Sequence, residues 1–128
     1  MAKLNLAPKA SGGKYYYGTF PETSLMMLAG YVGYFVAIVR ETEGITAIFS
    51  EDVKENLRLY SQTEFAGPFC LITFYAATSL DATGITAAAS GALAKEKIPA
   101  NVIAGYFHDH VLVPYGMKEK ALRILADA

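Results

Sequence analysis

The cluster His108-Asp109-His110 is the most conspicuous set of metal-ligating side chains in the sequence. Residues i and i+2 of a strand point to the same side. His108 and His110 could therefore coordinate one metal ion together, while Asp109 faces away. Zinc sites take three or four protein ligands, and a third ligand is not evident. We therefore favour a polar hairpin turn, or a supporting element at a sheet edge, and expect no bound metal.

A second candidate is the segment Ser79–Ile85, which stands between an apolar run and a helix-like pattern. A helix N-terminus presents unpaired N–H groups and a partial positive charge, so it can hold the carboxylate of an amino acid while Asp81 pairs with the ammonium. Gly84 permits close approach of the backbone. The alternative is that Asp81 or Ser79 only caps the helix, and the residues alone favour that alternative.

Catalytic chemistry has little support in the sequence. Cys70 is the only cysteine, so one chain can form neither an intrachain disulfide nor a thiolate cluster, which fits a reducing compartment. The cysteine sits inside an apolar run, where a buried, unreactive thiol is expected. The sequence contains no glycine-rich phosphate loop and no Gly-x-Ser-x-Gly elbow. We expect no catalytic residue and no cofactor.

Composition narrows the function classes further. The 128 residues are 53% hydrophobic and 18% charged, which suits one folded domain or two interlocked halves. A formal charge of -1 gives no attraction for nucleic acid or anionic lipid, and the aromatic run Tyr15–Tyr17 lacks the basic face that base stacking needs. No stretch approaches the roughly 20 apolar residues of a membrane span, and Met1–Lys9 lacks the apolar centre of a leader. We expect a cytoplasmic protein.

The second half of the sequence has the clearer periodicity. Phe69–Ala76 is a nearly unbroken apolar run, as expected for a strand at the centre of a sheet. From Thr83 to Lys97 the spacing becomes helical, with the apolar stripe Ile85, Ala88, Ala89, Ala92 and Leu93. Asn101–Phe107 and Val111–Val113 are strand-like, and a last amphipathic helix carries Met117, Ala121, Leu122 and Leu125. The predicted order is βαββα.

The first half predicts a shorter version of that order. Met1–Lys14 shows no sustained period and is interpreted as a tail. Tyr15–Phe20 is the first strand, and Tyr34–Arg40 with Ile45–Phe49 forms a hairpin whose second strand faces inward through Ile45, Ala47 and Phe49. Ser50 is the expected N-cap of a short helix that ends near Leu59.

These elements indicate an α+β fold of two tandem ferredoxin-like βαββα units, with helices on one face of antiparallel sheets. We place the halves at residues 1–66 and 67–128. A complete βαββαβ unit needs a sixth element, yet the sequence stops at Ala128 directly after a helix. We therefore expect the halves to exchange strands, with Tyr15–Phe20 completing the sheet of the second half.

Two segments also resemble a known family. Ser79–Ile85 is similar to the Asp-Arg-Pro-Gly-Leu turn of ACT domains, and Asn101–Phe107 resembles the ACT second strand, whose start commonly carries Asn. Tyr106–Pro114, which contains His-Asp-His and ends in Val-Pro, resembles a small group of stand-alone bacterial tandem ACT-like proteins. By element order the resemblance covers nearly the whole chain, and its specific motifs lie between about Phe69 and Pro114.

The resemblance implies a non-enzymatic, homodimeric regulatory or sensor protein that binds an amino acid between ACT units. In ACT domains the strand-to-helix turn supplies N–H groups and polar side chains, and the Asn of the second strand reaches a ligand held by a neighbouring unit. The implied ligand-binding residues are Ser79, Asp81, Thr83, Gly84, Ile85 and Asn101. Apart from the resemblance, His108, Asp109 and His110 are a candidate secondary site. Thr83 stands where ACT domains usually have Pro, which leaves the turn less rigid.

Two other functions stay open at this point. One is a structural module whose ACT-like layers serve only dimerisation or protein interaction. The other is a small metal-dependent protein that uses the His-Asp-His segment.

Overall fold

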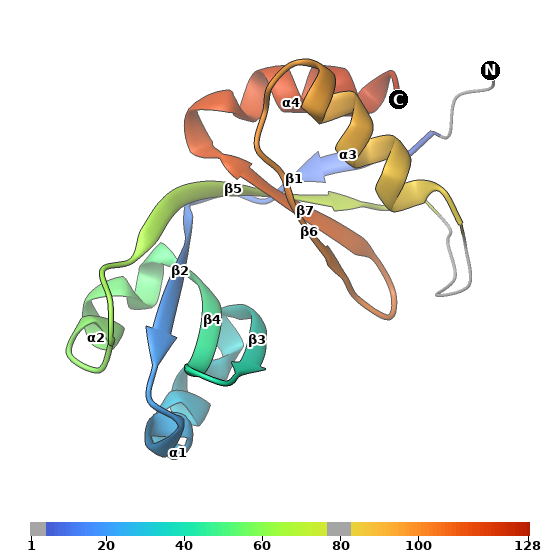
Figure 1. The fold of residues 1–128 in the computed structure, drawn as a ribbon. Coiled ribbons are helices and arrows are strands. Elements are labelled where there is room, and N and C mark those ends of the chain that lie inside the picture. Colours follow the sequence, from blue (N-terminus) through green and yellow to red (C-terminus); the bar gives the residue numbers. More distant parts are fainter. Residues whose placement is uncertain (1–4, 77–82) are drawn as a thin grey trace. The chain divides into compact units, whose positions relative to one another are not determined.

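The computed structural model describes residues 5–76 and 83–128, which fall into two compact units (Figure 1). The C-terminal unit contains the residues up to Gly12 together with Phe69–Ala128. The inserted unit, Gly13–Pro68, interrupts it in sequence. The inserted unit ends two residues after the predicted boundary at 66, whereas the first twelve residues belong to the other unit.

Four antiparallel strands and two main helices make up the C-terminal unit. The sheet has the order β1-β5-β7-β6, and α3 and α4 lie together on one of its faces (Figure 1). Because β1 precedes the predicted βαββα set in sequence but joins its sheet, the unit is a complete ferredoxin-like βαββαβ fold. The elements are β1 (Pro8–Ala10), β5 (Ala66–Phe74), α3 (Ile85–Lys95), β6 (Asn101–Ala104), β7 (Asp109–Pro114), η4 (Tyr115–Met117) and α4 (Lys118–Ala126).

The sixth element of this unit, strand β1, comes from the N-terminal segment. Pro8–Ala10 pairs in register with Ile72–Phe74, and the Ser11 N–H donates to the Leu71 carbonyl at 2.9 Å. The sequence pattern predicts a tail over Met1–Lys14 and an exchanged strand at Tyr15–Phe20. That assignment needs correction, because an exchanged strand lies within the supposed tail. A three-residue strand that begins with proline carries no alternating pattern by which it could be recognised.

The core of the C-terminal unit lies between its sheet and its helices. The stripe predicted for α3 is confirmed, since Ala89 and Leu93 are buried and Ile85 packs beside them. Helix α4 adds Ala121 and Leu125, also as predicted. Small alanines let α3 lie close to the sheet. No helix in the part of the chain that the structure describes is long and apolar enough to cross a membrane.

The inserted unit repeats the plan in shortened form, with antiparallel strands in the order β3-β4-β2. Ile45, Ala47 and Phe49 are all buried, which confirms the predicted inward face of the second hairpin strand. The Ser50 hydroxyl accepts a hydrogen bond from the Asp52 N–H at 3.2 Å, as expected of an N-cap. The elements are β2 (Tyr15–Phe20), η1 (Glu22–Ser24), α1 (Leu25–Leu28), η2 (Ala29–Tyr34), β3 (Phe35–Glu41), β4 (Gly44–Ser50), η3 (Glu51–Val53) and α2 (Lys54–Arg58).

Strand β1 should contribute measurably to stability. Leu6, just before β1, is 1% exposed and belongs to the core of the C-terminal unit, whereas Leu59 is 87% exposed. We expect Leu6→Ala to lower the free energy of unfolding by about 2–5 kcal/mol, because it leaves a cavity in a packed core. The matched variant Leu59→Ala should change it by less than about 0.5 kcal/mol. Urea denaturation measures both, and equal effects would show that the N-terminal segment is not docked.

Candidate functional site

The strand-to-helix turn before α3 is described from Thr83 onward, whereas Ser79 and Asp81 lie outside the described residues. The N-cap of α3 is Gly84, with a left-handed φ of 85° that glycine adopts without strain. Thr83 and Gly84 are exposed, and a Cβ on Gly84 would meet no atom of the described residues within 4 Å. Among residues 5–76 and 83–128, no side chain therefore closes the start of the helix, and its N-cap residue has no side chain of its own.

The first turn of α3 has the electrostatics for an anion. Its first intrahelical hydrogen bond runs from the Ala88 N–H to the Gly84 carbonyl at 2.9 Å. The N–H groups of Ile85, Thr86 and Ala87 precede that bond, so the helix itself offers them no acceptor. Together with the partial positive charge of the helix end, they can hold a carboxylate. Ile85 also packs against the core, which fixes the position of this turn.

The β6–β7 hairpin differs from the prediction in where it turns. Strand β6 ends at Ala104 rather than Phe107, and β7 already begins at Asp109, so the turn is Gly105–His108. The Gly105 N–H donates to the His108 carbonyl at 2.9 Å. A Cβ on Gly105 would lie 2.8 Å from that carbonyl oxygen, so only glycine fits. This tight turn leaves Tyr106 and Phe107 exposed at the tip, which explains why their apolar character suggested a longer strand.

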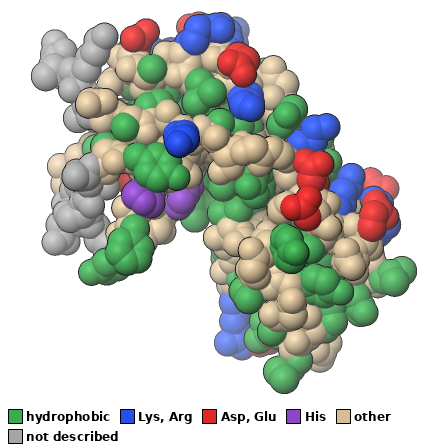
Figure 2. Space-filling view, turned by 180° about the vertical axis from the view of Figure 1, so that it is seen from behind, with side chains coloured by type: hydrophobic (Ala, Val, Ile, Leu, Met, Phe, Trp, Pro, Cys, Tyr) green, Lys and Arg blue, Asp and Glu red, His purple; other side chains and the backbone are tan. Residues whose placement is uncertain are grey.

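The two histidines lie next to one another on the surface shown in Figure 2. His110 shares a 2.8 Å hydrogen bond between its Nδ1 and the Thr73 hydroxyl. The His108 ring packs on Tyr75 with 4.7 Å between ring centroids. Its Nδ1 is buried and has no hydrogen-bond partner among the described residues. The sequence did not predict that Thr73 and Tyr75 contact the two histidines. Thr73 is a polar residue inside an otherwise apolar strand, and this could have identified it.

Strand register brings the hairpin and the turn to the same end of the sheet. Ala104 lies opposite Asp109, and Asp109 lies opposite Phe74, the last residue of β5. The chain then continues toward α3, whose first turn is at that end in Figure 1. Asn101 lies three residues back along β6, roughly 10 Å from the hairpin end. Within one C-terminal unit the first turn of α3 therefore lies at the same end of the sheet as the histidine hairpin, whereas Asn101 lies farther back along β6.

Burial shifts the titration of two groups in this unit. It lowers the pKa of His110, an effect reinforced by the neighbouring His108 and opposed by Asp109. It raises the pKa of the Cys70 thiol, which Lys118 counters only in part. The thiol therefore stays protonated and unreactive at neutral pH.

A metal centre gains no support from the geometry. No group of three or more His, Cys, Asp or Glu side chains that could hold a metal ion occurs in residues 5–76 and 83–128. The two histidines supply at most two ligands, and a zinc site needs more.

Comparison with known proteins places the C-terminal unit in a family. Residues 69–127 match the family model of the ACT domain. These residues of the C-terminal unit resemble an ACT domain. ACT domains are regulatory rather than catalytic and bind small-molecule ligands such as amino acids. No curated protein matches the chain.

Solved structures share the fold of the chain. A Vibrio cholerae protein of unknown function, described as a possible transport protein, is 33% identical, with 97% of this chain and 90% of that one covered and a TM-score of 0.78. The chain therefore belongs to the same family as the Vibrio protein. An Agrobacterium tumefaciens protein is 22% identical, with 93% and 85% covered and a TM-score of 0.74. The regulatory subunit of aspartate kinase from Thermus flavus shares the fold at 10% identity, with 93% and 94% covered and a TM-score of 0.71.

The lowered pKa of His110 predicts a pH-dependent stability. The folded chain favours neutral His110, so below about pH 6.5, the usual value for histidine, the unfolded chain binds more protons. Stability should therefore fall as the pH drops through that value and reach its reduced level below the folded-state pKa. His110→Asn should flatten this part of the stability profile from pH 7.5 to 5.

The control for this prediction is His108→Asn. It removes one of the effects that lower the pKa of His110 while leaving the Thr73 hydrogen bond in place, so the pH dependence should shrink without disappearing. Chemical denaturation at a series of pH values gives all three profiles. An unchanged profile in His110→Asn would refute the assignment.

Proposed function

We propose that this protein is a non-enzymatic regulatory module of the ACT type that binds an amino acid at the turn before α3. The observation that carries the proposal is the exposed start of α3, where the N–H groups of Ile85, Thr86 and Ala87 follow an N-cap glycine that leaves free space. The ligand carboxylate is bound there, and Asp81 pairs with its ammonium. Ser79 and Thr83 add polar groups to the same turn.

The second part of the proposal is a homodimer in which Asn101 of one copy contacts the ligand that is bound at the turn of the other copy. The support is the separation of roughly 10 Å between Asn101 and the end of the sheet that carries the turn. Asn101 is exposed at the start of β6, which is an edge strand of its own unit's sheet among the described residues. A two-fold dimer brings such an edge to a second copy and creates two equivalent sites.

A thermal-shift screen of the twenty amino acids tests the binding. A ligand that binds only the folded chain adds about 2.7 kcal/mol at one hundred times its dissociation constant, and the midpoint should rise by several degrees. The double variant Asp81→Ala, Asn101→Ala should lose the part of the shift that comes from binding at this turn. The matched variant Asp52→Ala, Asn56→Ala changes exposed residues of the inserted unit and should keep it.

The other outcomes of the screen discriminate between functions. A flat response to every amino acid would overturn amino-acid sensing and favour a dimerisation or interaction module. A response to metal ions alone, lost in His108→Ala, would favour the metal-dependent alternative. Circular dichroism of each variant shows whether the fold is intact.

Mixing single variants tests the shared site. A dimer of one Asp81→Ala chain and one Asn101→Ala chain contains one site with both defects and one intact site. Random exchange of subunits should therefore restore roughly a quarter of the wild-type binding capacity, measured by calorimetry. If Asn101 acted within its own copy, mixing would restore nothing.

A further inference from the structure

The inserted unit contains a hollow of about 510 Å³, distant in sequence from the turn before α3. One wall is helix α2, which contributes Lys54 and Arg58. The other wall is the segment Ser61–Phe65, which follows the helix. This volume lies within the range of about 300–1,000 Å³ that small-molecule sites occupy.

The segment wall is fixed in place. The Gln62 N–H donates to the Thr19 carbonyl at 2.7 Å, and the hydroxyls of Thr19 and Thr63 are 2.8 Å apart. The Phe65 ring packs edge-on against Phe49 with 4.9 Å between centroids. These contacts anchor the segment to β2 and to the core of the inserted unit, so the hollow exists without a ligand.

The helix wall is cationic. Lys54 and Arg58 are four residues apart and so lie on one face of α2. The Lys54 Nζ is 4.3 Å from the centre of the Tyr16 ring, which holds the ammonium without neutralising it. Glu55 binds Arg58 through two hydrogen bonds of 3.2 and 2.9 Å and raises its pKa. In the part of the chain that the structure describes, Lys54 forms no ion pair, so its charge remains available.

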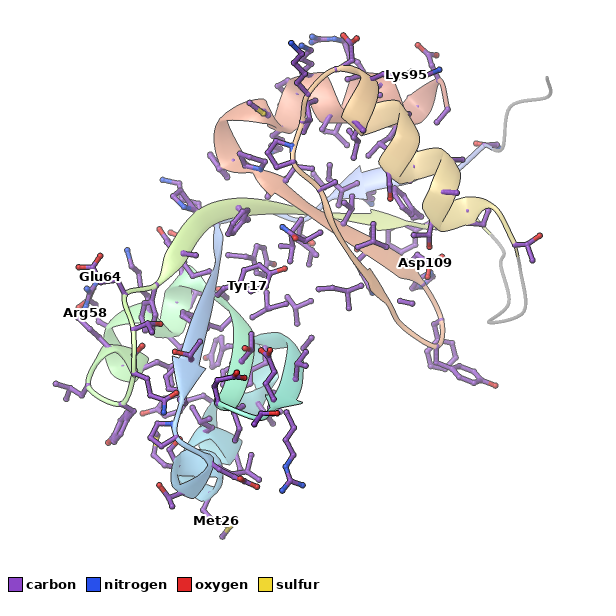
Figure 3. All side chains as sticks on the ribbon, in the orientation of Figure 1. Tyr17, Met26, Arg58, Glu64, Lys95 and Asp109 are labelled. Carbon is purple, nitrogen blue, oxygen red and sulfur yellow. The ribbon has the colours of Figure 1, made fainter. Side chains whose placement is uncertain are left out.

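The segment side is anionic. Glu64 lines the hollow and lies at the same outer end as Arg58 (Figure 3). On the far side of Gln62 and Thr63 is a second hollow of about 290 Å³, which Glu41 and Glu43 line. The hollow thus has positive charge on the wall formed by α2 and negative charge on the side of the segment Ser61–Phe65.

We infer that the hollow between α2 and Ser61–Phe65 is a second small-molecule site that takes a zwitterionic amino acid. The ligand carboxylate pairs with Lys54, and its ammonium pairs with Glu64. The Gln62 amide and the Thr63 hydroxyl supply further hydrogen bonds, and Phe65 offers an apolar surface to the ligand side chain. Glu64 disfavours a ligand that carries only negative charge, because like charges repel. Lys54 disfavours an amine without a carboxylate for the same reason. The site is independent of the one proposed at the turn before α3.

Calorimetric titration of the full chain tests the inference. The protein carries Asp81→Ala and Asn101→Ala, which disable the first site, and each of the twenty amino acids is titrated in turn. We expect at least one to bind with one site per chain. Adding Lys54→Met should weaken that binding by at least about tenfold, because a charged hydrogen bond is lost, whereas Lys95→Met on α3 should leave it unchanged.

A second variant tests the polarity of the site. For the amino acid that binds, the matching acid without an amino group should bind more weakly to the parent protein. In Glu64→Gln that preference should shrink, because the partner of the ammonium is gone. Backbone amide shifts of Gln62 and Thr63 in nuclear magnetic resonance spectra locate the ligand without relying on affinity.

The two proposals can fail separately. No binding to the variant with the disabled first site, or unchanged binding in Lys54→Met, would overturn the second site. Full wild-type binding in the Asp81→Ala, Asn101→Ala variant, with loss only in Lys54→Met, would instead overturn the first.

Discussion

Strand β5 can occupy the centre of its sheet only if both of its edges find hydrogen-bonding partners. Its apolar residues Cys70, Ile72 and Phe74 are buried, so unpaired backbone groups along it would have no access to water. Strand β7 pairs with one edge along Phe69–Phe74, and strand β1 pairs with the other edge along Ile72–Phe74. The inserted position of Gly13–Pro68 follows from this requirement, because strand β1 precedes the inserted unit in sequence and the other five elements follow it.

The candidate site depends on the same strand. The end of β5 fixes where the turn to α3 begins, and its pairing with β7 brings the histidine hairpin to that end. Thr73 then faces His110 across the two strands and fixes one imidazole by a hydrogen bond. The neighbouring His108 has its Nδ1 buried without a partner among the described residues. This end of the sheet thus combines an exposed helix start with polar groups that the core alone does not require.

Sequence periodicity predicted the elements in which one side is buried along their whole length. The stripe from Ile85 to Leu93 and the alternation through Ile45 and Phe49 are of this kind, because burial of one face imposes the period. Periodicity did not identify short elements or the ends of edge elements. Strand β1 is only three residues long, and the predicted end of β6 was too late because Tyr106 and Phe107 are exposed aromatic residues with high strand propensity. The turn residues and Asn101 are predicted from family resemblance, with Asn101 expected to reach a ligand held by a neighbouring unit, and such a resemblance gives residue types without geometry.

The interrupted arrangement of the C-terminal unit also determines an order of events during synthesis. The inserted unit is translated as one continuous segment and contains its own core, so it can fold while the ribosome is still producing the rest of the chain. Strand β1 is translated before β5 but pairs with residues about sixty positions later, and closing so long a loop is entropically unfavourable until β5 and its helices exist. A segment that is translated before the inserted unit is therefore among the last to dock. Until then β5 has an open edge, which makes the nascent chain vulnerable to pairing with other chains.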